Sequence, residues 1–304
     1  VAIVSGAQAN ADLLLFAANN AIGGTVSVYS DARLATYHAG PALDLATLEG
    51  LQETLLDEIA AAKGAAAAEN YFARLDTAGD TTYVPYKQPL TNYISSLVAL
   101  GGAYWDTMES AASFVGVGIK GITVPLRDGM PVPTQNNFVA GDLDQLTGLK
   151  GNAATKYVNL NINVSSFSRD DHSVSIYRSE AAVTSARELS ISPNGIELLA
   201  RTSQIRAIST NGSFIDGSGV VPTFVGFSRS NSAGYDWRCG TSGTRVNASL
   251  ALAALANTAS LFALAGGASA FSDVRMATYH AGPALDLATL EGLQDTLITE
   301  IAAI

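Results

Sequence analysis

The chain has 304 residues and a formal net charge of −10; 48% of its residues are hydrophobic and only 14% are charged. This charged fraction lies well below the roughly 25% of an average soluble protein, which favours a β-rich extracellular or virion protein and excludes a disordered chain. The acidic balance argues against a nucleic-acid partner, because phosphate contacts need a basic surface. Cys239 is the only cysteine, so no disulfide forms within the chain and the redox compartment stays open.

One segment of the sequence occurs twice. Residues 30–62 begin SDARLATYHAGPALDLATLEGLQ, and residues 272–304 begin SDVRMATYHAGPALDLATLEGLQ. The second copy ends the chain, so we expect it to close a module, and the first copy should close one too. Only residues 1–29 precede the first copy, and the chain has no initiator Met. We therefore expect residues 1–62 to be the C-terminal fragment of a preceding module in a longer tandem array.

Residues 63–113 are predicted to form a helical lead-in. They overlap an Ala-rich run at residues 60–68, and residues 71–75 (YFARL) have the composition of a short strand. Pro89 suits the first turn of a helix, which is expected to end near Gly101. Apolar residues recur behind this proline at helical spacing: Leu90, Tyr93, Ile94, Leu97 and Val98.

From about residue 114 onward, the pattern changes to short strands. Apolar and polar residues alternate in short runs, and turn signals such as Pro193-Asn194-Gly195 and Asn211-Gly212 separate the runs. The predicted strands cover residues 173–177, 189–191, 196–200, 223–227, 235–239, 261–265 and 274–280. Short strands with frequent turns predict an antiparallel sandwich or barrel and argue against a parallel α/β sheet.

The repeated segment itself is predicted to be a strand followed by a closing helix. Residues 275–280 form the strand, Gly282 and Pro283 turn the chain, and Asp286 is a candidate N-cap. The helix carries one apolar stripe, formed by Leu290, Leu293, Leu297 and Ile301. We expect this helix to pack on an edge or end of the sandwich.

Residues 246–272 carry no charge and have the length of a membrane span. Asp12 aligns near the centre of this run, opposite Thr258, and a charge there costs about 2.5–3.5 kcal/mol in a bilayer. Asn257 and Gly266 also interrupt the run. We therefore predict a strand and loop of the sandwich, with no membrane insertion.

Four motifs point to a known family. Residues 132–139 read VPTQNNFV, and residues 148–157 read GLKGNAATKY. Residues 227–235 contain an SR…Y strand, and residues 271–282 read FSDVRMATYHAG. Together with the helical segment before them, these motifs resemble the concanavalin A-like (LamG/lectin-type) sandwich modules of tailed-bacteriophage structural and tail-fibre proteins.

The resemblance implies a mainly β fold: an antiparallel concanavalin A-like jelly-roll sandwich with a helical lead-in and a closing C-terminal helix. The complete module would cover residues 114–304, the lead-in residues 63–113, and residues 1–62 would be the end of a preceding sandwich module. The resemblance is specific for fold and virion context and weak for activity, because this fold carries lectins, glycanases and plain spacers alike.

No pattern in the sequence indicates an enzyme. Glycanases on such sandwiches need two carboxylates that flank the scissile bond, but Glu180, Glu188 and Glu197 lie one per segment and are interpreted as solvent-facing charges. His172 stands beside Asp170 and Asp171 without a nucleophile motif such as G-x-S-x-G. We therefore predict no catalytic residues, with a polysaccharide-degrading tailspike as the less favoured alternative.

The best candidate for ligand binding is the polar loop at residues 228–234, which lies between two predicted strands. The residues proposed to contact a ligand are Arg229, Asn231, Ser232, Tyr235 and Trp237. Trp237 shares one strand face with Cys239, which favours a core position, and sugar stacking by Trp237 is the alternative. Tyr104 and Trp105, at a second short apolar face, leave the same two interpretations open.

No cofactor is predicted. Asp170, Asp171 and Asp216 are weak candidates for metal ligands, because their oxygens suit calcium but lack the spacing of a calcium loop. Calcium therefore stays possible.

The function expected from these observations is a non-catalytic structural component of a phage virion, a tail fibre or similar appendage. Its lectin-like modules would space the appendage or contact host-surface glycans. The expected partners are other virion proteins and further copies of the chain, with a trimer by family analogy, and the expected location is the virion or the extracellular space. A bacterial extracellular adhesin or surface filament built from the same module is the alternative.

Overall fold

The structure is a computed structural model that describes residues 17–20, 25–29, 45–163, 170–180, 186–190, 197–201, 204–209, 213–217, 223–231, 234–239, 241–246, 258–263 and 269–304. The chain divides into two compact units, residues 1–56 and 57–304. In the first unit, β1 (Ala17–Asn20) and β2 (Thr25–Tyr29) form a two-stranded antiparallel sheet. Among the helices that the structure describes, none is both long and apolar enough to cross a membrane.

Helix α1 (Leu45–Ala78) includes the whole Ala-rich run and the segment behind it. The prediction of a short strand at residues 71–75 is therefore wrong. Tyr and Phe favour strands by local propensity, but the surrounding Ala residues favour a helix. The buried residues follow the helical spacing i, i+3, i+4, i+7: Ala68, Tyr71, Phe72 and Leu75.

Two further helices precede the sheets. Helix α2 (Lys87–Ala99) begins after the 3-10 turn η1 (Val84–Tyr86) and confirms the helix predicted behind Pro89. Its buried residues are Pro89, Leu90, Tyr93, Ile94 and Leu97. Helix α3 (Gly102–Thr107) follows. Tyr104 and Trp105 are buried, which confirms their interpretation as core residues.

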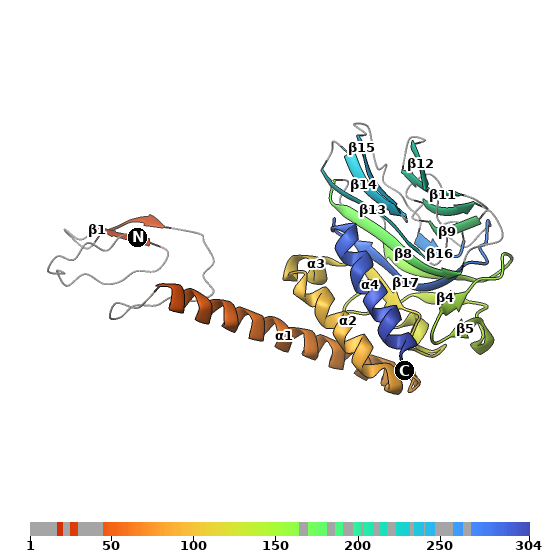
Figure 1. Ribbon diagram of the computed structural model, residues 1–304, viewed down its shortest axis with the longest axis horizontal. Helices are drawn as coiled ribbons and strands as arrows, with labels where there is room; N and C mark the ends of the chain where they lie inside the picture. The colour runs from red at the N-terminus through yellow and green to blue at the C-terminus, as the bar shows by residue number, and fades with distance from the viewer. Residues whose placement is uncertain are drawn as a thin grey trace. The chain divides into compact units, whose positions relative to one another are not determined.

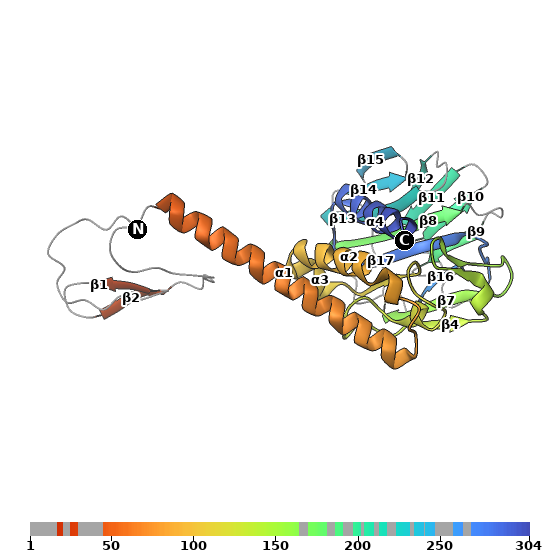
Figure 2. The ribbon, with the colours of Figure 1, turned by 60° about the horizontal axis from the view of Figure 1, so that its bottom comes forward.

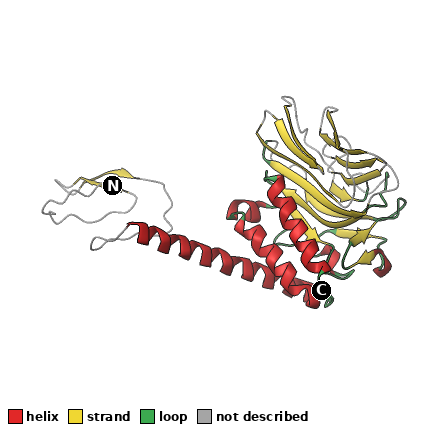
Figure 3. Ribbon diagram, in the orientation of Figure 1, coloured by secondary structure: helices red, strands yellow, loops and turns green. Residues whose placement is uncertain are grey.

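Most of the remaining chain forms two antiparallel sheets (Figures 1 and 3). The first sheet has the strand order β12-β11-β10-β9-β16-β7-β4. Its strands are β4 (Thr134–Asn136), β7 (Tyr157–Asn163), β9 (Ala186–Ser190), β10 (Glu197–Arg201), β11 (Gln204–Ser209), β12 (Ser213–Gly217) and β16 (Thr258–Leu261).

The second sheet has the order β15-β14-β13-β8-β17-β6-β5, and β3 pairs with β17 as well. Its strands are β3 (Ser110–Ser113), β5 (Leu143–Asp144), β6 (Gly148–Lys150), β8 (His172–Glu180), β13 (Thr223–Asn231), β14 (Gly234–Cys239), β15 (Thr241–Val246) and β17 (Arg275–Gly282). Short 3-10 turns, η2 (Gly121–Thr123) and η3 (Ala140–Asp142), lie in the connections. The fold is mainly β, with two antiparallel sheets and flanking helices, as the sequence predicted.

A hydrophobic core joins the two sheets. Alternate residues of β8 and β13 point into it, including Val174, Ile176, Val225 and Phe227, and they meet residues of β7, β9 and β16 from the other sheet. Cys239 is buried in the same core. A face-to-face pair of sheets with inward alternation is a β-sandwich.

One ion pair is buried between the sheets. The Arg178 Nη1 of β8 lies 3.2 Å from the Glu188 Oε1 of β9, and the two side chains are 3% and 0% exposed. Burial raises the pKa of Glu188, and the charge of Arg178 opposes this rise. The prediction that Glu188 faces solvent is therefore wrong: its partner lies in the opposite sheet, where it compensates a charge that would be costly to bury alone.

A second core lies on the outer face of the second sheet, where the helices pack (Figure 2). Helix α4 (Leu287–Ala302) contacts α2, β13 and β14. The Asp286 carboxylate accepts hydrogen bonds from the backbone N–H groups of Ala288 (3.3 Å) and Thr289 (3.0 Å), which confirms the predicted N-cap. The closing helix covers a face of the sandwich and not the edge or end that the sequence analysis expected.

Strand β17 fills the middle of the second sheet. It pairs with β8 along one side and with β6 and β3 along the other. Its two polar aromatic residues are buried among helix and strand partners: His280 Nε2 bonds to the hydroxyl of Tyr93, and the hydroxyls of Tyr279 and Ser110 lie 3.0 Å apart. Burial lowers the pKa of His280 to about 3, so the imidazole is neutral in the fold.

The packing of α4 predicts a contrast between the two copies of the repeat. Leu297→Ala should lower the free energy of unfolding by about 2–5 kcal/mol, because this side chain is 1% exposed and its loss leaves a cavity. Leu55→Ala, the matching change in the first copy, should alter it by less than about 0.5 kcal/mol, because Leu55 is 43% exposed. Urea denaturation of both variants measures the difference, and equal losses would contradict this description of the two helices.

Candidate functional site

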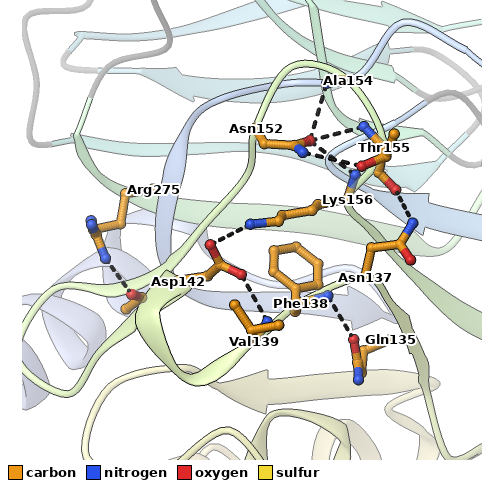
Figure 4. Close-up of polar contacts among 11 residues, drawn as sticks. Gln135, Asn137, Phe138, Val139, Asp142, Asn152, Ala154, Thr155, Lys156 and Arg275 are labelled. Atoms are coloured by element: carbon orange, nitrogen blue, oxygen red, sulfur yellow. Dashed lines mark hydrogen bonds and ion pairs between the residues drawn. The ribbon is translucent and has the colours of Figure 1, made fainter.

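The motif segments at residues 132–139 and 148–157 meet in one polar corner of the sandwich (Figure 4). Gln135 Oε1 accepts from the backbone N–H of Phe138 at 3.0 Å, and Asn137 Nδ2 donates to the carbonyl of Thr155 at 3.1 Å. Asn137 has a φ of 62°, a left-handed conformation that asparagine tolerates better than most residues. The first motif is therefore a turn fastened to the second.

Asn152 organises the second motif. Its Oδ1 accepts hydrogen bonds from three successive backbone N–H groups, those of Ala154 (3.1 Å), Thr155 (2.9 Å) and Lys156 (3.0 Å). Its Nδ2 donates to the hydroxyl of Thr155 at 3.1 Å. A short polar side chain that bonds the backbone just after it is a typical turn builder.

An ion pair connects the corner to the η3 turn. Lys156 Nζ binds Asp142 Oδ1, and each side chain is 16% exposed. The other carboxylate oxygen of Asp142 accepts from the backbone N–H of Val139 at 2.8 Å. Because Asp142 and Lys156 are mostly shielded, their attraction is stronger than that of a surface pair.

Two glycines let this corner approach the closing strand. Gly148 has a φ of 96°, and a Cβ built on it would lie 2.0 Å from the carbonyl oxygen of Met276. A Cβ on Gly151 would lie 1.9 Å from the carbonyl oxygen of Ser272. Both approaches are too close for any side chain, so Gly148 is required for the contact with β17 and Gly151 for the contact with Ser272, three residues before β17.

Charged residues strengthen the same contact. Arg275 of β17 donates from Nη1 to the carbonyl of Gly148 at 2.8 Å and from Nε to Glu180 at 2.7 Å. Lys150 binds the other oxygen of Glu180 at 2.7 Å. These cations hold the pKa of Glu180 below its usual range, with the hydrogen bond from Lys150 as the largest cause. Half-exposed Glu180 thus links β8, β6 and β17.

The prediction of a loop at residues 228–234 is wrong for most of its length: residues 228–231 end β13, and β14 begins at Gly234. Asn231 is exposed, whereas Arg229 is 1% exposed and binds Asp170, with Nη2 and Nε at 2.9 and 3.0 Å from the carboxylate. Trp237 is half-buried and packs against the core. This agrees with the core position that was favoured because Trp237 and Cys239 share a strand face. Ser232 lies outside the described residues, as does the side chain of Tyr235 on β14. Of the three predicted residues whose side chains the structure describes, Asn231 is the exposed one.

Two of the three candidate metal ligands, Asp170 and Asp171, bind other groups of the protein. Asp170 binds Arg229, and Asp171 Oδ1 accepts from the backbone N–H of Ala284 at 2.7 Å, which anchors the turn before α4. The side chain of Asp216 on β12 lies outside the described residues. Within the part of the chain that the structure describes, no three His, Cys, Asp or Glu residues form a group able to hold a metal ion. His172 is buried edge-on against Phe227.

Sequence reasoning missed a pocket of about 280 Å³ between the C-terminal end of α1 and residues 123–132. Arg74 borders it and donates to the carbonyls of Pro125 and Leu126, both at 2.9 Å. Burial lowers the pKa of Arg74. The pocket could not be found from the sequence because residues 71–75 were assigned to a strand.

Comparisons with known proteins give distant similarities of fold. No family model matches the chain, and no curated protein matches it. Among solved structures, the botulinum neurotoxin serotype D binding domain is 13% identical at a TM-score of 0.44, covering 63% of this chain and 52% of that one. A mutant of Trypanosoma rangeli sialidase is 12% identical at a TM-score of 0.43, covering 64% of this chain and 34% of that one.

The chain thus spans about half the length of the neurotoxin binding domain and a third of the sialidase. At these identities and TM-scores, the similarity carries no inference about a ligand or an activity.

The close approach at Gly151 generates a prediction. Gly151→Ala should lower the free energy of unfolding by at least about 1–3 kcal/mol, because the added methyl group collides with the backbone of Ser272. Gly141→Ala is the matched control, since nothing lies within 4 Å of its Cβ position. Urea denaturation compares them, and a Gly151→Ala protein as stable as the control would show that the corner does not press on the closing strand.

Proposed function

We propose that this protein is a non-catalytic structural component of a tailed-phage virion, a tail fibre or similar appendage. Its sandwich modules space the appendage and contact host-surface glycans. The proposal includes a location in the virion, outside the host cell, and assembly with other virion proteins as a homo-oligomer, with a trimer as the first expectation. The domain division into residues 1–62, 63–113 and 114–304 is part of the proposal.

The observation that carries the proposal is the use of the motif residues. Asn137, Asn152 and Lys156 all bind other parts of the same corner, and Gly148 and Gly151 bring that corner against β17 and the segment just before it. A set of polar residues that bind one another builds a module and leaves few groups for a substrate. This supports a role in construction, the role that the resemblance to phage modules implies.

Two of the three carboxylates considered for hydrolysis are also engaged, and the side chain of the third, Glu197 on β10, lies outside the described residues. Glu188 is fully buried against Arg178, and Glu180 binds Lys150 and Arg275. A glycosidase needs two carboxyl groups that reach the scissile bond from opposite sides, about 5–10 Å apart. Glu188 cannot reach a sugar at the surface, which favours binding over hydrolysis.

Glycan contact is assigned to the end of the sandwich that carries the β13–β14 loop. Asn231 is exposed there, and its amide both donates and accepts hydrogen bonds, as sugar hydroxyls do. One such contact is weak. Repetition of the module along a chain and among chains of an oligomer raises the overall affinity through avidity.

The test is binding of the purified chain to a panel of bacterial surface polysaccharides, with and without calcium. We expect selective binding without release of reducing ends, and a loss of affinity of about tenfold in Asn231→Ala, the equivalent of about 1.4 kcal/mol. Asn70→Ala, which changes an exposed asparagine of α1, is the matched control and should bind as the unaltered protein does.

Release of reducing ends that disappears in Glu180→Gln would contradict the non-catalytic proposal and favour a depolymerase. A folded chain that binds no polysaccharide would reduce the module to a spacer. The genes beside the coding sequence separate a virion protein, expected among tail-assembly genes, from a bacterial adhesin, expected among secretion genes.

A further inference from the structure

The first half of α1 exposes an apolar face. Four side chains in this half are large, hydrophobic and strongly exposed: Leu51 (63%), Leu55 (43%), Leu56 (49%) and Ile59 (43%). By helical spacing, Leu51, Leu55 and Ile59 lie on one side of the helix. Leu48, half-exposed, lies on the same side of the helix. We call Leu48, Leu51, Leu55 and Ile59 the first-copy face. Single exposed leucines are common, but a contiguous row on one side of a helix marks an interaction surface.

The repeat identifies what such a face packs against. Helices α1 and α4 begin at equivalent positions of the two copies, at Leu45 and Leu287. The counterparts of the first-copy face are Leu290, Leu293, Leu297 and Ile301. Three of them are fully buried and Leu293 is half-buried, in the groove that α2, β13 and β14 form. The same sequence is therefore covered in one copy and exposed in the other, so the neighbour decides the burial.

The polar positions around the face are also retained. In α4, Glu291 pairs with Arg238 of β14, and Glu300 accepts from Asn92 of α2 at 3.0 Å. The first copy keeps both acids, as Glu49 and Glu58. Pairing of two apolar helices would not require carboxylates at these positions, whereas a groove with an arginine and an asparagine does.

The differences between the two helices leave the four apolar positions of the face unchanged, and Ile298, which packs against the helical core, becomes Leu56. Thr299 is the position where the first copy changes charge, to Asp57, and Thr299 is exposed. Asp295, which accepts from the Tyr177 hydroxyl at 2.8 Å, becomes Glu53 and remains a carboxylate. The face itself is thus identical in the two copies, and the changed positions that make contacts keep their apolar or acidic character.

We propose that the first-copy face is a docking surface for a second sandwich body of the same kind. The occupant has an α2–β13–β14 groove with an arginine and an asparagine at the positions of Arg238 and Asn92. The proposal does not depend on glycan binding or on a virion location, and it assigns the first half of α1 a role that the fold of residues 57–304 does not supply.

The test places the first-copy helix of one full chain in the groove of another. The receptor chain carries Leu297→Asp and Ile301→Asp, which release its own α4, and Asn92→Cys in the groove. The donor chain carries Glu58→Cys, at the position of Glu300. Cys239 does not interfere, because burial raises the pKa of its thiol to about 11. A short thiol cross-linker joins the chains, and a chain with Asn92→Cys and Glu300→Cys calibrates its reach.

We expect donor–receptor dimers, and a yield lower by roughly tenfold or more when the donor also carries Leu55→Asp and Ile59→Asp, because two buried aspartates replace apolar contacts. If the receptor unfolds, Leu297→Ala replaces its two aspartate changes, and the yield must still exceed that of a receptor with an intact α4. Equal yields with both donors overturn the proposal. Predominant linkage between two Glu58→Cys donors overturns it as well, because the partner would then be another α1.

Discussion

The sandwich depends on β17, the last strand in the chain. Strand β17 lies between β8 on one side and β6 and β3 on the other, so the second sheet is incomplete until residues 275–282 are in place. Helix α4 follows directly and seals the outer face of the same sheet. Pairing between distant segments is slow to form and cooperative once formed. The closing strand and helix therefore act together, which explains why the repeat preserves them as one unit.

The motif corner is best understood through this closing strand. The backbone of β17 lies too close to Gly148 for a side chain, and that of Ser272, just before β17, lies too close to Gly151. Arg275 fixes the contact with a hydrogen bond to Gly148. This hydrogen bond joins two segments that are separated by more than a hundred residues in the sequence. Construction accounts for the polar residues of the corner, and the proposed recognition falls to exposed positions such as Asn231 at the end of β13.

The sequence predicted the features that local patterns control: the antiparallel strands, the helix behind Pro89 and the N-cap at Asp286. It failed where a distant partner decides. Residues 71–75 have strand-forming side chains but join a helix because their apolar face is buried, and Glu188 is buried because Arg178 faces it from the other sheet. Of the candidate ligand residues, burial of Arg229 against Asp170 could not be foreseen either, since 59 residues separate them. The exposure of the first-copy face of α1 could not be predicted either, because its four residues are identical in the two copies and only their surroundings differ.

Native-state hydrogen exchange measures the central claim, that the closing strand is an integral part of the sandwich. Amides of β17 should exchange as slowly as those of β8, and only through global unfolding, because the two strands share a ladder in the middle of the sheet. Exchange of β17 through a local opening of clearly lower free energy, with β8 still protected, would show that the sandwich stands without its closing strand and would contradict the account.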